Sequence, residues 1–424
     1  MQEIFYNGNI VTNNENNEMC EAMLVNDGSV VFVGGNDEVL ELKNKDTKTN
    51  DLNGKFVYPT LFDFNANVFD KIDNKIKNAN HDKKFQNSSE IGENYDNFQD
   101  FEIYKNEYLE LEKEYVRNGI TTIIETKIDK REFAFWKKMS EDKLLKIDVL
   151  AYVDLVHSKQ VMDDNCVTYR KYRNHFRLGG YYLRIDGKVH ELKAWLKKSY
   201  TGTKSHYGSS EFYGEQLNFL IKTALDEKKQ VLFDVNGDKA IEEVLTVFEE
   251  IENKDKVTSF FRPIFFGASI VRKNIYSKLK HFDVTLLFEN YDLKTHSYIK
   301  KYIGIFRQRY FHNYKDLIKN DVRFFCINRS YDIQNLDSAI IDLKNKKRKL
   351  YLKMLKNNDF RLKYLKLLQK LIFVNPSYVC FDQETKGSIE TQKQASFMIL
   401  NSDIFSEDFT SAGSIDSVFV NGEK

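Results

Sequence analysis

Residues that could carry chemistry follow a short apolar run near position 60. Leu61–Phe62 leads into Asp63, Asn65 and Asn67 at alternate positions. A buried strand that ends in polar residues is typical of the carboxyl-terminal mouth of a barrel. The carboxylate of Asp63 could pair with a cation there, whereas the amides of Asn65 and Asn67 are weak donors to a metal ion. We therefore expect these three residues to lie in a pocket.

The histidines and cysteines give no further support for a metal site. No two histidines are spaced as His-X-His or His-x-x-x-His, and no Cys-x-x-Cys pair occurs. His157 follows the strand pattern of residues 152–156 and is either a mouth residue or a surface or packing histidine. We expect the four cysteines to be reduced thiols, because they lie far apart in the chain; they are Cys20, Cys166, Cys326 and Cys380.

The bulk composition is that of an ordinary globular chain. Its 424 residues suit a barrel of about 250–300 residues plus a smaller unit. The net charge is +1, so no overall field attracts nucleic acid or a membrane. The amino terminus has no apolar leader pattern, and no stretch approaches the roughly 18 apolar residues of a membrane span. We expect a cytoplasmic protein with neither nucleic acid nor a membrane as partner.

Helical and strand patterns alternate through the middle of the chain. This alternation implies parallel strands joined by helical crossovers. We therefore predict an α/β protein with a TIM-like (β/α)8 barrel. The predicted helix and strand pairs are 107–118 and 120–125, 130–141 and 146–155, 213–228 and 230–235, 239–253 and 262–266, 271–281 and 285–288, and 313–320 and 323–327, with a further strand at 181–185.

Both ends of the chain are rich in strand and turn patterns. Residues 4–12, with Asn7-Gly8 at their centre, predict one hairpin, and residues 22–33, with Asp27-Gly28, predict another. Strand patterns return after residue 395. The simplest assembly is a small β-sandwich domain built from both termini, residues 1–58 and 375–424, with the barrel domain inserted between them as residues 59–374.

Two segments have unusual compositions. Residues 71–98 are rich in Asn, Lys, Asp and Ser, which favours an exposed or partly disordered loop over an active-site loop. Residues 344–370 contain eleven Lys or Arg and one acid, Asp359. Leucines recur through this second segment, so amphipathic helices with a solvated basic side are favoured over a nucleic-acid-binding face.

Five short segments together carry a resemblance to a known family. They are residues 4–34, 51–63, 118–122, 236–240 and 386–400, which include Asn-Gly turns and the apolar run before Asp63. In this order they resemble the amidohydrolase superfamily, most closely the branch of N-substituted formamide deformylases and related N-acyl hydrolases. The resemblance covers nearly the whole chain. It implies a TIM barrel joined to a composite β-sandwich.

The resemblance also implies a metal-dependent hydrolase. One or two divalent ions, usually zinc, would sit at the carboxyl-terminal face of the barrel, held by His, a carboxylated Lys and Asp. This sequence keeps Asp63, but the other matching positions hold different residues. Asn65 and Asn67 match the two histidines of the first strand, and Tyr182 matches the lysine. Further along the chain, Asp234 and Phe266 match two histidines, and Arg329 matches the last aspartate.

These replacements argue against a resident metal. Asn amides are weak ligands and Phe266 has no donor atom, while Arg329 places a permanent positive charge where a dication needs an anion. We therefore expect no metal cofactor. Our hypothesis is that the guanidinium of Arg329 takes the place of the ion and pairs with Asp234 or Asp63 in the barrel mouth.

Three functions stay open, in this order of preference. The first is a non-catalytic relative that binds a small molecule or a partner in a pocket lined by Asp63, Asn65, Asn67, Tyr182 and Phe266. The second is a hydrolase of non-peptide C–N bonds that works without a metal, with Asp234 as general base and Arg329 as oxyanion stabiliser. The third is a structural or assembly role, in which the chain forms a homodimer. The sequence favours a protein that is not an active enzyme.

Overall fold

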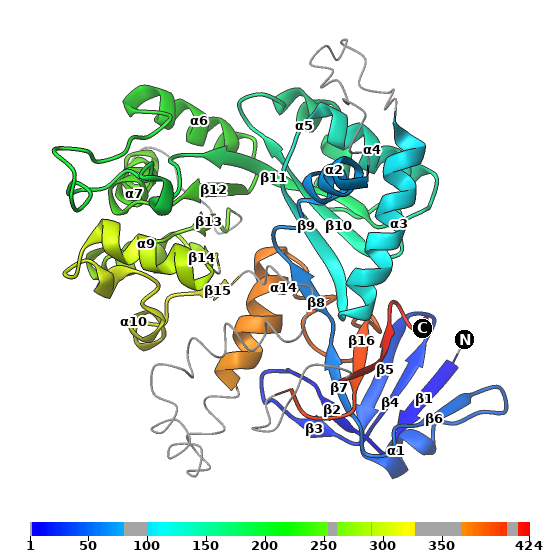
Figure 1. Cartoon of the computed structure of the whole chain (residues 1–424). Coiled ribbons are helices and arrows are strands. Elements are labelled where there is room, and N and C mark those ends of the chain that lie inside the picture. Colours follow the sequence, from blue (N-terminus) through cyan, green and yellow to red (C-terminus); the bar gives the residue numbers. More distant parts are fainter. Residues whose placement is uncertain (1, 80–99, 253–260, 290, 327–365, 405–413) are drawn as a thin grey trace.

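Figure 1 shows the computed structural model of the chain, which describes residues 2–79, 100–252, 261–289, 291–326, 366–404 and 414–424. Its largest sheet has eight strands that follow one another in chain order, and neighbouring strands pair in parallel. The strands are β8 (Leu61–Asp63), β9 (Ile120–Ile128), β10 (Asp148–Asp154), β11 (Phe176–Arg184), β12 (Val231–Val235), β13 (Ile264–Gly267), β14 (Thr285–Phe288) and β15 (Phe324–Cys326). The curled parallel sheet confirms the predicted α/β class with a TIM-like barrel.

Helices connect these strands and cover the outer face of the sheet. They are α2 (Val68–Ala79), α3 (Phe101–Arg117), α4 (Lys130–Glu141), α5 (Lys159–Asp164), α6 (Gly214–Asp226), α7 (Asp238–Glu252), α8 (Tyr276–His281), α9 (Leu293–Ile303) and α10 (Tyr314–Lys319). The start of α4 is fixed by a capping box, in which Asp129 and Glu132 accept each other's backbone N–H groups. None of the helices in the described ranges is long and apolar enough to cross a bilayer.

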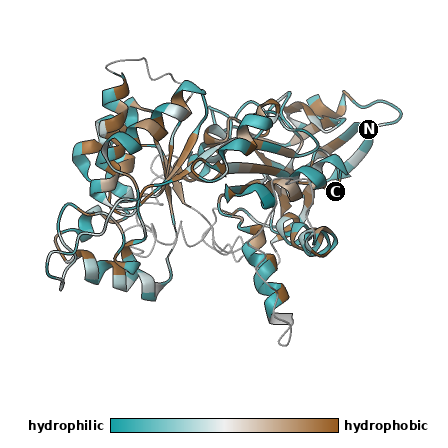
Figure 2. Ribbon diagram, turned by 90° about the horizontal axis from the view of Figure 1, so that it is seen from above, coloured by the Kyte–Doolittle hydropathy of each residue, from teal (hydrophilic) through white to brown (hydrophobic). Residues whose placement is uncertain are grey.

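Side chains alternate between the two faces of the barrel sheet. On β12, Leu232 belongs to the cluster inside the barrel, while Phe233 packs outward against Phe248 of α7 with ring centroids 5.7 Å apart. This period of two is the pleat of a strand that is buried on both faces. Figure 2 shows the apolar strands in the middle, with helices of mixed polarity around them.

Two small sheets are built from the ends of the chain. One has the order β5 (Ser29–Gly34), β4 (Ala22–Asn26), β1 (Gln2–Tyr6) and β6 (Lys48–Asp51), with the short helix α1 (Asn36–Leu40) beside it. The other has the order β17 (Ile415–Phe419), β16 (Phe397–Leu400), β7 (Phe56–Pro59), β2 (Asn9–Val11) and β3 (Met19–Cys20). Both chain ends lie among these sheets (Figure 1), and the division of domains at residues 58 and 375 stays a prediction.

Buried charges join the base of the barrel to the carboxyl-terminal part of the chain. A π-helical turn, η6 (Lys370–Val374), and helix α14 (Asn375–Val379) lead to this base. There Arg177 of β11 forms a buried ion pair of 3.0 Å with Asp382 and donates to the carbonyl of Cys380 at 2.5 Å. Lys386 donates to Thr122 at 2.8 Å and pairs with Asp148. These contacts hold residues 380–386 against the amino-terminal ends of β9, β10 and β11.

The predicted hairpin of residues 4–12 is wrong. Strand β1 pairs with β4 in one small sheet, whereas β2 pairs with β3 and β7 in the other. A type I′ turn needs positive φ at both central residues, and of this pair only Asn7 has it, at 59°. The predicted hairpin at Asp27-Gly28 is confirmed, because β4 and β5 pair antiparallel and the turn residues have φ values of 46° and 76°.

The amino-terminal part of the predicted loop 71–98 is instead helical. Helix α2 runs to residue 79, and residues 80–98 lie outside the described part of the chain. The few apolar residues of α2 recur at helical spacing, since Val68, Phe69, Ile72 and Ile76 all pack on the core. The polar composition concealed that spacing. Helices α5 and α9 were likewise not predicted, and most of the basic segment 344–370 is not described.

The buried pair of Arg177 and Asp382 leads to a prediction about stability. Their side chains are 3% and 4% exposed. The substitution Asp382→Ala leaves a buried guanidinium without its partner and is expected to lower the free energy of unfolding by about 3–5 kcal/mol in urea denaturation. The matched control is Glu110→Ala, which removes an exposed pair with Lys113 and should change stability by less than about 0.5 kcal/mol. Equal effects of the two substitutions would contradict the prediction.

Candidate functional site

A cavity of about 530 Å³ opens at the carboxyl-terminal ends of the barrel strands. We call it the mouth cavity. Its walls come from the ends of β9, β10, β11, β12 and β13 and from the turns that follow β8 and β14, so residues far apart in the sequence meet there. The residues that line it are Asn65, Asn67, Phe69, Asp70, Glu125, Thr126, Lys127, Asp129, Glu132, Asp154, His157, Ser158, Tyr182, Lys188, Asp234, Phe266 and Glu289.

Most of the residues singled out from the sequence lie around this cavity. Asn65, Asn67, Tyr182, Asp234 and Phe266 all line it. Asp63, in contrast, is buried at the end of β8 and lies 3.9 Å from the ammonium group of Lys71. Burial raises the pKa of this carboxyl to about 6, although Lys71 opposes the shift. Arg329 lies outside the described residues, so its predicted pairing with Asp63 or Asp234 stays a prediction.

Asp234 is held by three hydrogen-bond donors. The hydroxyl of Tyr182 donates to it at 3.0 Å, and the side-chain amide of Asn236 donates at 3.1 Å. The ammonium group of Lys188 lies 3.3 Å from the same carboxylate. A carboxylate that accepts this many hydrogen bonds is fixed in direction. Asp234, which the sequence suggested as a general base, is therefore already bound by three side chains of the protein.

Lys188 is the functional candidate that sequence reasoning missed. Its ammonium group lies between Asp234 and Glu289, 2.9 Å from the latter, and 4.6 Å from the centre of the Phe266 ring. Burial alone would lower the pKa of Lys188, but the two carboxylates outweigh it and raise that pKa above its ordinary value. Lys188 follows β11 within the run Asp186-Gly187-Lys188, and nothing in that run indicates that the side chain turns into the mouth.

The loop that carries Lys188 is anchored by Asp186. This carboxylate, which is 1% exposed, accepts the backbone N–H groups of Trp195 at 2.7 Å, Asn236 at 2.7 Å and Gly237 at 2.9 Å. Burial raises its pKa to about 7, against the effect of those three donors. Asp186 therefore ties the loop after β11 to the turn after β12, the strand that carries Asp234.

Two further carboxyls in the mouth titrate near neutrality. Glu125 of β9 is 4% exposed and accepts the backbone N–H of Val68 at 3.0 Å. Burial raises its pKa to about 7. Burial, followed by the charges of Asp129 and Glu125, raises the pKa of Glu132 to about 8. Groups with such values can exchange protons at the pH of a cell.

The expected mouth position of His157 can be compared directly with the structure. The residue lines the cavity, and its ring nitrogen Nδ1 lies 3.1 Å from the carboxylate of Asp154. The side chain is 76% exposed, so it stands at the rim. Lys127 pairs with the same carboxylate at 3.2 Å from the other side. Asp154 is thus shared by two rim cations when His157 is protonated.

The mouth cavity does not suit the divalent ion that the family resemblance implies. Within the described ranges, no group of three or more His, Cys, Asp or Glu side chains is placed to share an ion. Asn65 and Asn67 contribute amides, and Phe266 contributes no donor atom. The carboxylates of Asp234 and Glu289 already share the ammonium group of Lys188, whose charge opposes a second cation between them.

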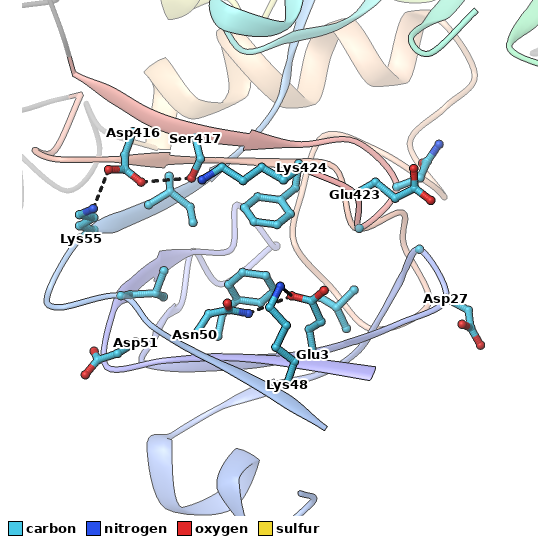
Figure 3. Close-up of a pocket in the computed structure, with 18 residues that line it drawn as sticks. Glu3, Asp27, Lys48, Asn50, Asp51, Lys55, Asp416, Ser417, Glu423 and Lys424 are labelled. Carbon is cyan, nitrogen blue, oxygen red and sulfur yellow. Dashed lines mark hydrogen bonds and ion pairs between the residues drawn. The ribbon is translucent and has the colours of Figure 1, made fainter. Parts of the chain in front are cut away.

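A second and larger cavity, of about 800 Å³, lies between the two small sheets. Figure 3 shows two ion pairs among its charged residues. Lys55 pairs with Asp416 at 2.7 Å, and Lys48 pairs with Glu3 at 3.2 Å. No strand of the barrel sheet contributes to its lining. We therefore take the mouth cavity, where carboxyls with shifted pKa values converge, as the candidate functional site.

Comparisons with known proteins identify the fold. No family model matches the sequence, and no curated protein matches it. The crystal structure of an uncharacterized metal-dependent hydrolase from Pyrococcus horikoshii OT3 matches with a TM-score of 0.75 and 18% identity, over 95% of this chain and 98% of that chain. A second such hydrolase, from Pyrococcus furiosus, gives 0.73 and 15% over 96% and 100%. Ochratoxinase from A. niger gives 0.59 and 11% over 99% and 94%.

At these identities the likeness is one of fold. The chain has the architecture of these two metal-dependent hydrolases over nearly their whole length. The crystal structure of an amidohydrolase also matches it, with a TM-score of 0.61 and 10% identity over 100% of this chain and 98% of that chain. This agrees with the fold implied by the sequence resemblance. Neither the formamide deformylase branch nor the identity of the site residues is tested by the likeness, so both stay predictions.

The raised pKa of Glu125 predicts how stability depends on pH. The folded protein holds this proton more tightly than the unfolded chain, so this contribution to stability is complete below about pH 4.5 and is lost as the pH rises to about 7. The substitution Glu125→Gln keeps the acceptor for Val68 but cannot ionise. It should reduce the fall in unfolding free energy between pH 5 and pH 8 by about 2–3 kcal/mol in urea denaturation. The exposed Glu141→Gln serves as control, and an unchanged pH profile in Glu125→Gln would exclude this cause.

Proposed function

We propose that the chain is a relative of the amidohydrolases that binds a small ligand in its barrel mouth and does not carry out their metal-dependent hydrolysis. The fold supports the kinship, and the mouth cavity supports a ligand site at the usual place for a TIM barrel. The lack of metal chemistry is inferred from the side chains at the mouth.

The observation that carries this proposal is the position of Lys188. Its ammonium group sits between Asp234 and Glu289, at 3.3 Å and 2.9 Å. A resident lysine there offsets one of the two negative charges that would otherwise attract a dication, and its own charge repels one. It supplies the fixed positive charge that the sequence reasoning assigned to Arg329. We propose Lys188, and not Arg329, as the charge that replaces the ion.

The charge of the mouth supports one class of ligand. Seven of the lining residues are acids (Asp70, Glu125, Asp129, Glu132, Asp154, Asp234 and Glu289), whereas two are lysines, Lys127 and Lys188. Glu125 and Glu132 carry a proton for part of the time at neutral pH, but the other five acids still outnumber the two lysines, so acceptors exceed donors. This balance favours a small ligand with amino groups or other hydrogen-bond donors. Asn65 and Asn67, which follow β8, would add amide donors and acceptors that orient it.

A hydrolase of C–N bonds without a metal is the second candidate. It is favoured by the carboxyls of Glu125 and Glu132, whose pKa values of about 7 and about 8 suit general acid–base catalysis. In this version Asp234 does not act as the base, because Tyr182, Lys188 and Asn236 occupy it. A structural role as a homodimer stays a third prediction, which an oligomeric-state measurement would test.

Metal content and turnover separate the first two candidates. We expect the purified full-length protein to contain less than about 0.1 metal ion per chain by mass spectrometry, and to hydrolyse no member of a panel of formyl and N-acyl amides with or without added zinc or manganese. Turnover without a metal that is lost in Glu132→Gln and kept in Glu141→Gln would support the second candidate. Stoichiometric zinc with turnover would overturn the proposal.

The role assigned to Lys188 gives its own prediction. Lys188→Met leaves two buried carboxylates facing each other, so the unfolding free energy at pH 7.5 should fall by about 3 kcal/mol and recover partly at pH 4.5, where one carboxylate takes up a proton. Millimolar manganese should raise the melting temperature of this variant more than that of the wild type, because the vacated position then attracts a cation. Lys193→Met, which removes a 64% exposed lysine, is the control. Similar behaviour of both variants would remove Lys188 from this role.

A further inference from the structure

Two segments beside the mouth contain no acidic residue. Residues 192–210 follow the turn that carries Lys188, and residues 293–311 follow β14. Together they have nine cationic side chains and no Asp or Glu, although the whole chain has 64 basic and 63 acidic residues. We call these two segments the basic cap. Its cationic residues are Lys193, Lys197, Lys198, Lys204, Lys294, Lys300, Lys301, Arg307 and Arg309.

The two segments of the basic cap form one packed unit. Tyr200 from the first segment and Ile303 from the second belong to the same buried cluster. The backbone N–H of Thr201 donates to the carbonyl of Tyr302 at 2.7 Å. In Figure 1, α9 and the loop that precedes α6 lie on the same side of the molecule. The cations of both segments therefore contribute to one local electrostatic field.

The basic cap presents two adjacent apolar side chains at a rigid tip. Ile305 and Phe306 are 76% and 79% exposed, the highest values for large hydrophobic residues in the described ranges. Gly304, with φ of 71°, ends α9 and turns the chain outward. Arg307 then fixes the tip by donating to the carbonyls of Ile303 at 2.5 Å, Lys198 at 2.8 Å and Ser199 at 2.8 Å.

Several cations around this tip are available to an external anion. None of the described carboxylates forms an ion pair with Lys198, Lys204, Lys294, Lys301 or Arg309, and all five are exposed. Arg309 donates from Nε to the carbonyl of Phe306 at 2.9 Å, so its charge stands directly beside the tip. Lys301 lies in the last turn of α9, four residues before Ile305.

We propose that the basic cap docks on the surface of an anionic lipid bilayer, with Ile305 and Phe306 inserted among the headgroups. Bulky apolar side chains gain free energy on leaving water for the acyl boundary, and surrounding lysines and arginines attract anionic headgroups. The lysine stems can lie along the apolar layer while their charges stay at the interface. An anionic bilayer as partner accounts both for the exposed apolar tip and for the cations around it.

The composition of the tip favours a bilayer over single-stranded nucleic acid as the partner. Protein surfaces that bind single strands present several aromatic rings on which successive bases stack, whereas this tip offers one ring, Phe306, beside the aliphatic Ile305. The nearby rings of Tyr298 and Tyr302 stack on each other, with centroids 6.2 Å apart and an interplanar angle of 13°. The chain-wide charge of +1, from which no membrane partner was expected, averages the basic cap against acidic regions elsewhere. The field that a bilayer meets is the local one.

Vesicle sedimentation tests this proposal with the full-length protein. We expect wild-type protein to bind vesicles of phosphatidylcholine with 30% phosphatidylglycerol, in about 0.1 M salt, and to bind vesicles of pure phosphatidylcholine at least about tenfold more weakly. The tip variant Ile305→Ser/Phe306→Ser and the charge variant Lys198→Glu/Lys301→Glu should each bind the anionic vesicles about tenfold more weakly than wild type.

The matched control is Phe219→Ser, which removes a 70% exposed phenylalanine from α6, outside the basic cap. It should bind like wild type, and circular dichroism should show that every variant is folded. Three results would overturn the proposal: no binding of wild type to anionic vesicles, equal binding by the tip variant and wild type, or weaker vesicle binding than binding to a single-stranded oligonucleotide at the same salt. Because the readout is binding to lipid, it does not depend on any ligand of the mouth cavity.

Discussion

The structure depends on one constraint: each buried charge must be paired with an opposite charge and with hydrogen bonds. A cation or carboxylate taken out of water is tolerated only where opposite charge and hydrogen bonds replace the lost hydration. Lys188 meets this condition between Asp234 and Glu289 at the mouth, and Arg177 meets it against Asp382 at the base. The barrel is therefore fastened at both ends by polar contacts, with an apolar layer between them.

Under the function proposed above, this arrangement would let a fold shared with metal-dependent hydrolases persist without a metal ion at its mouth. In a metal site the ion itself holds together side chains from several strands. Here the ammonium group of Lys188 connects the ends of β12 and β14 through two carboxylates. A covalently attached cation cannot dissociate, so the mouth keeps its charge balance without a supply of metal. It also cannot polarise water as a dication does.

The sequence predicted the architecture well and the site in part. Alternating helix and strand patterns gave the parallel sheet, and α4 and β14 occupy the residues expected for them, because local periodicity and capping determine such elements. The polar residues after β8 and at Asp234 were expected at the mouth, since parallel strands end at one edge. Lys188 and Glu289 were not, because each follows its strand in a turn whose course depends on tertiary contacts.

The errors in the predicted fold also arise from tertiary contacts that local sequence does not contain. The turn at Asn7-Gly8 has the composition of a hairpin, yet the competition between two sheets for β1 and β2 decided its conformation. Helix α2 was concealed by its polar residues, although Phe69 and Ile72 are placed at helical spacing. Composition averaged over a window loses this information, just as net charge averaged over the chain loses the separation of an acidic mouth from the cationic surface beside it.

Asp186 connects those two surfaces. Its carboxylate accepts hydrogen bonds from the backbone N–H of Trp195, in the first segment of the basic cap, and from the backbone N–H of Asn236, in the turn after β12. A shift of either segment must carry the other with it or break a buried hydrogen bond. One buried side chain therefore fixes the position of the cationic surface relative to the acidic mouth.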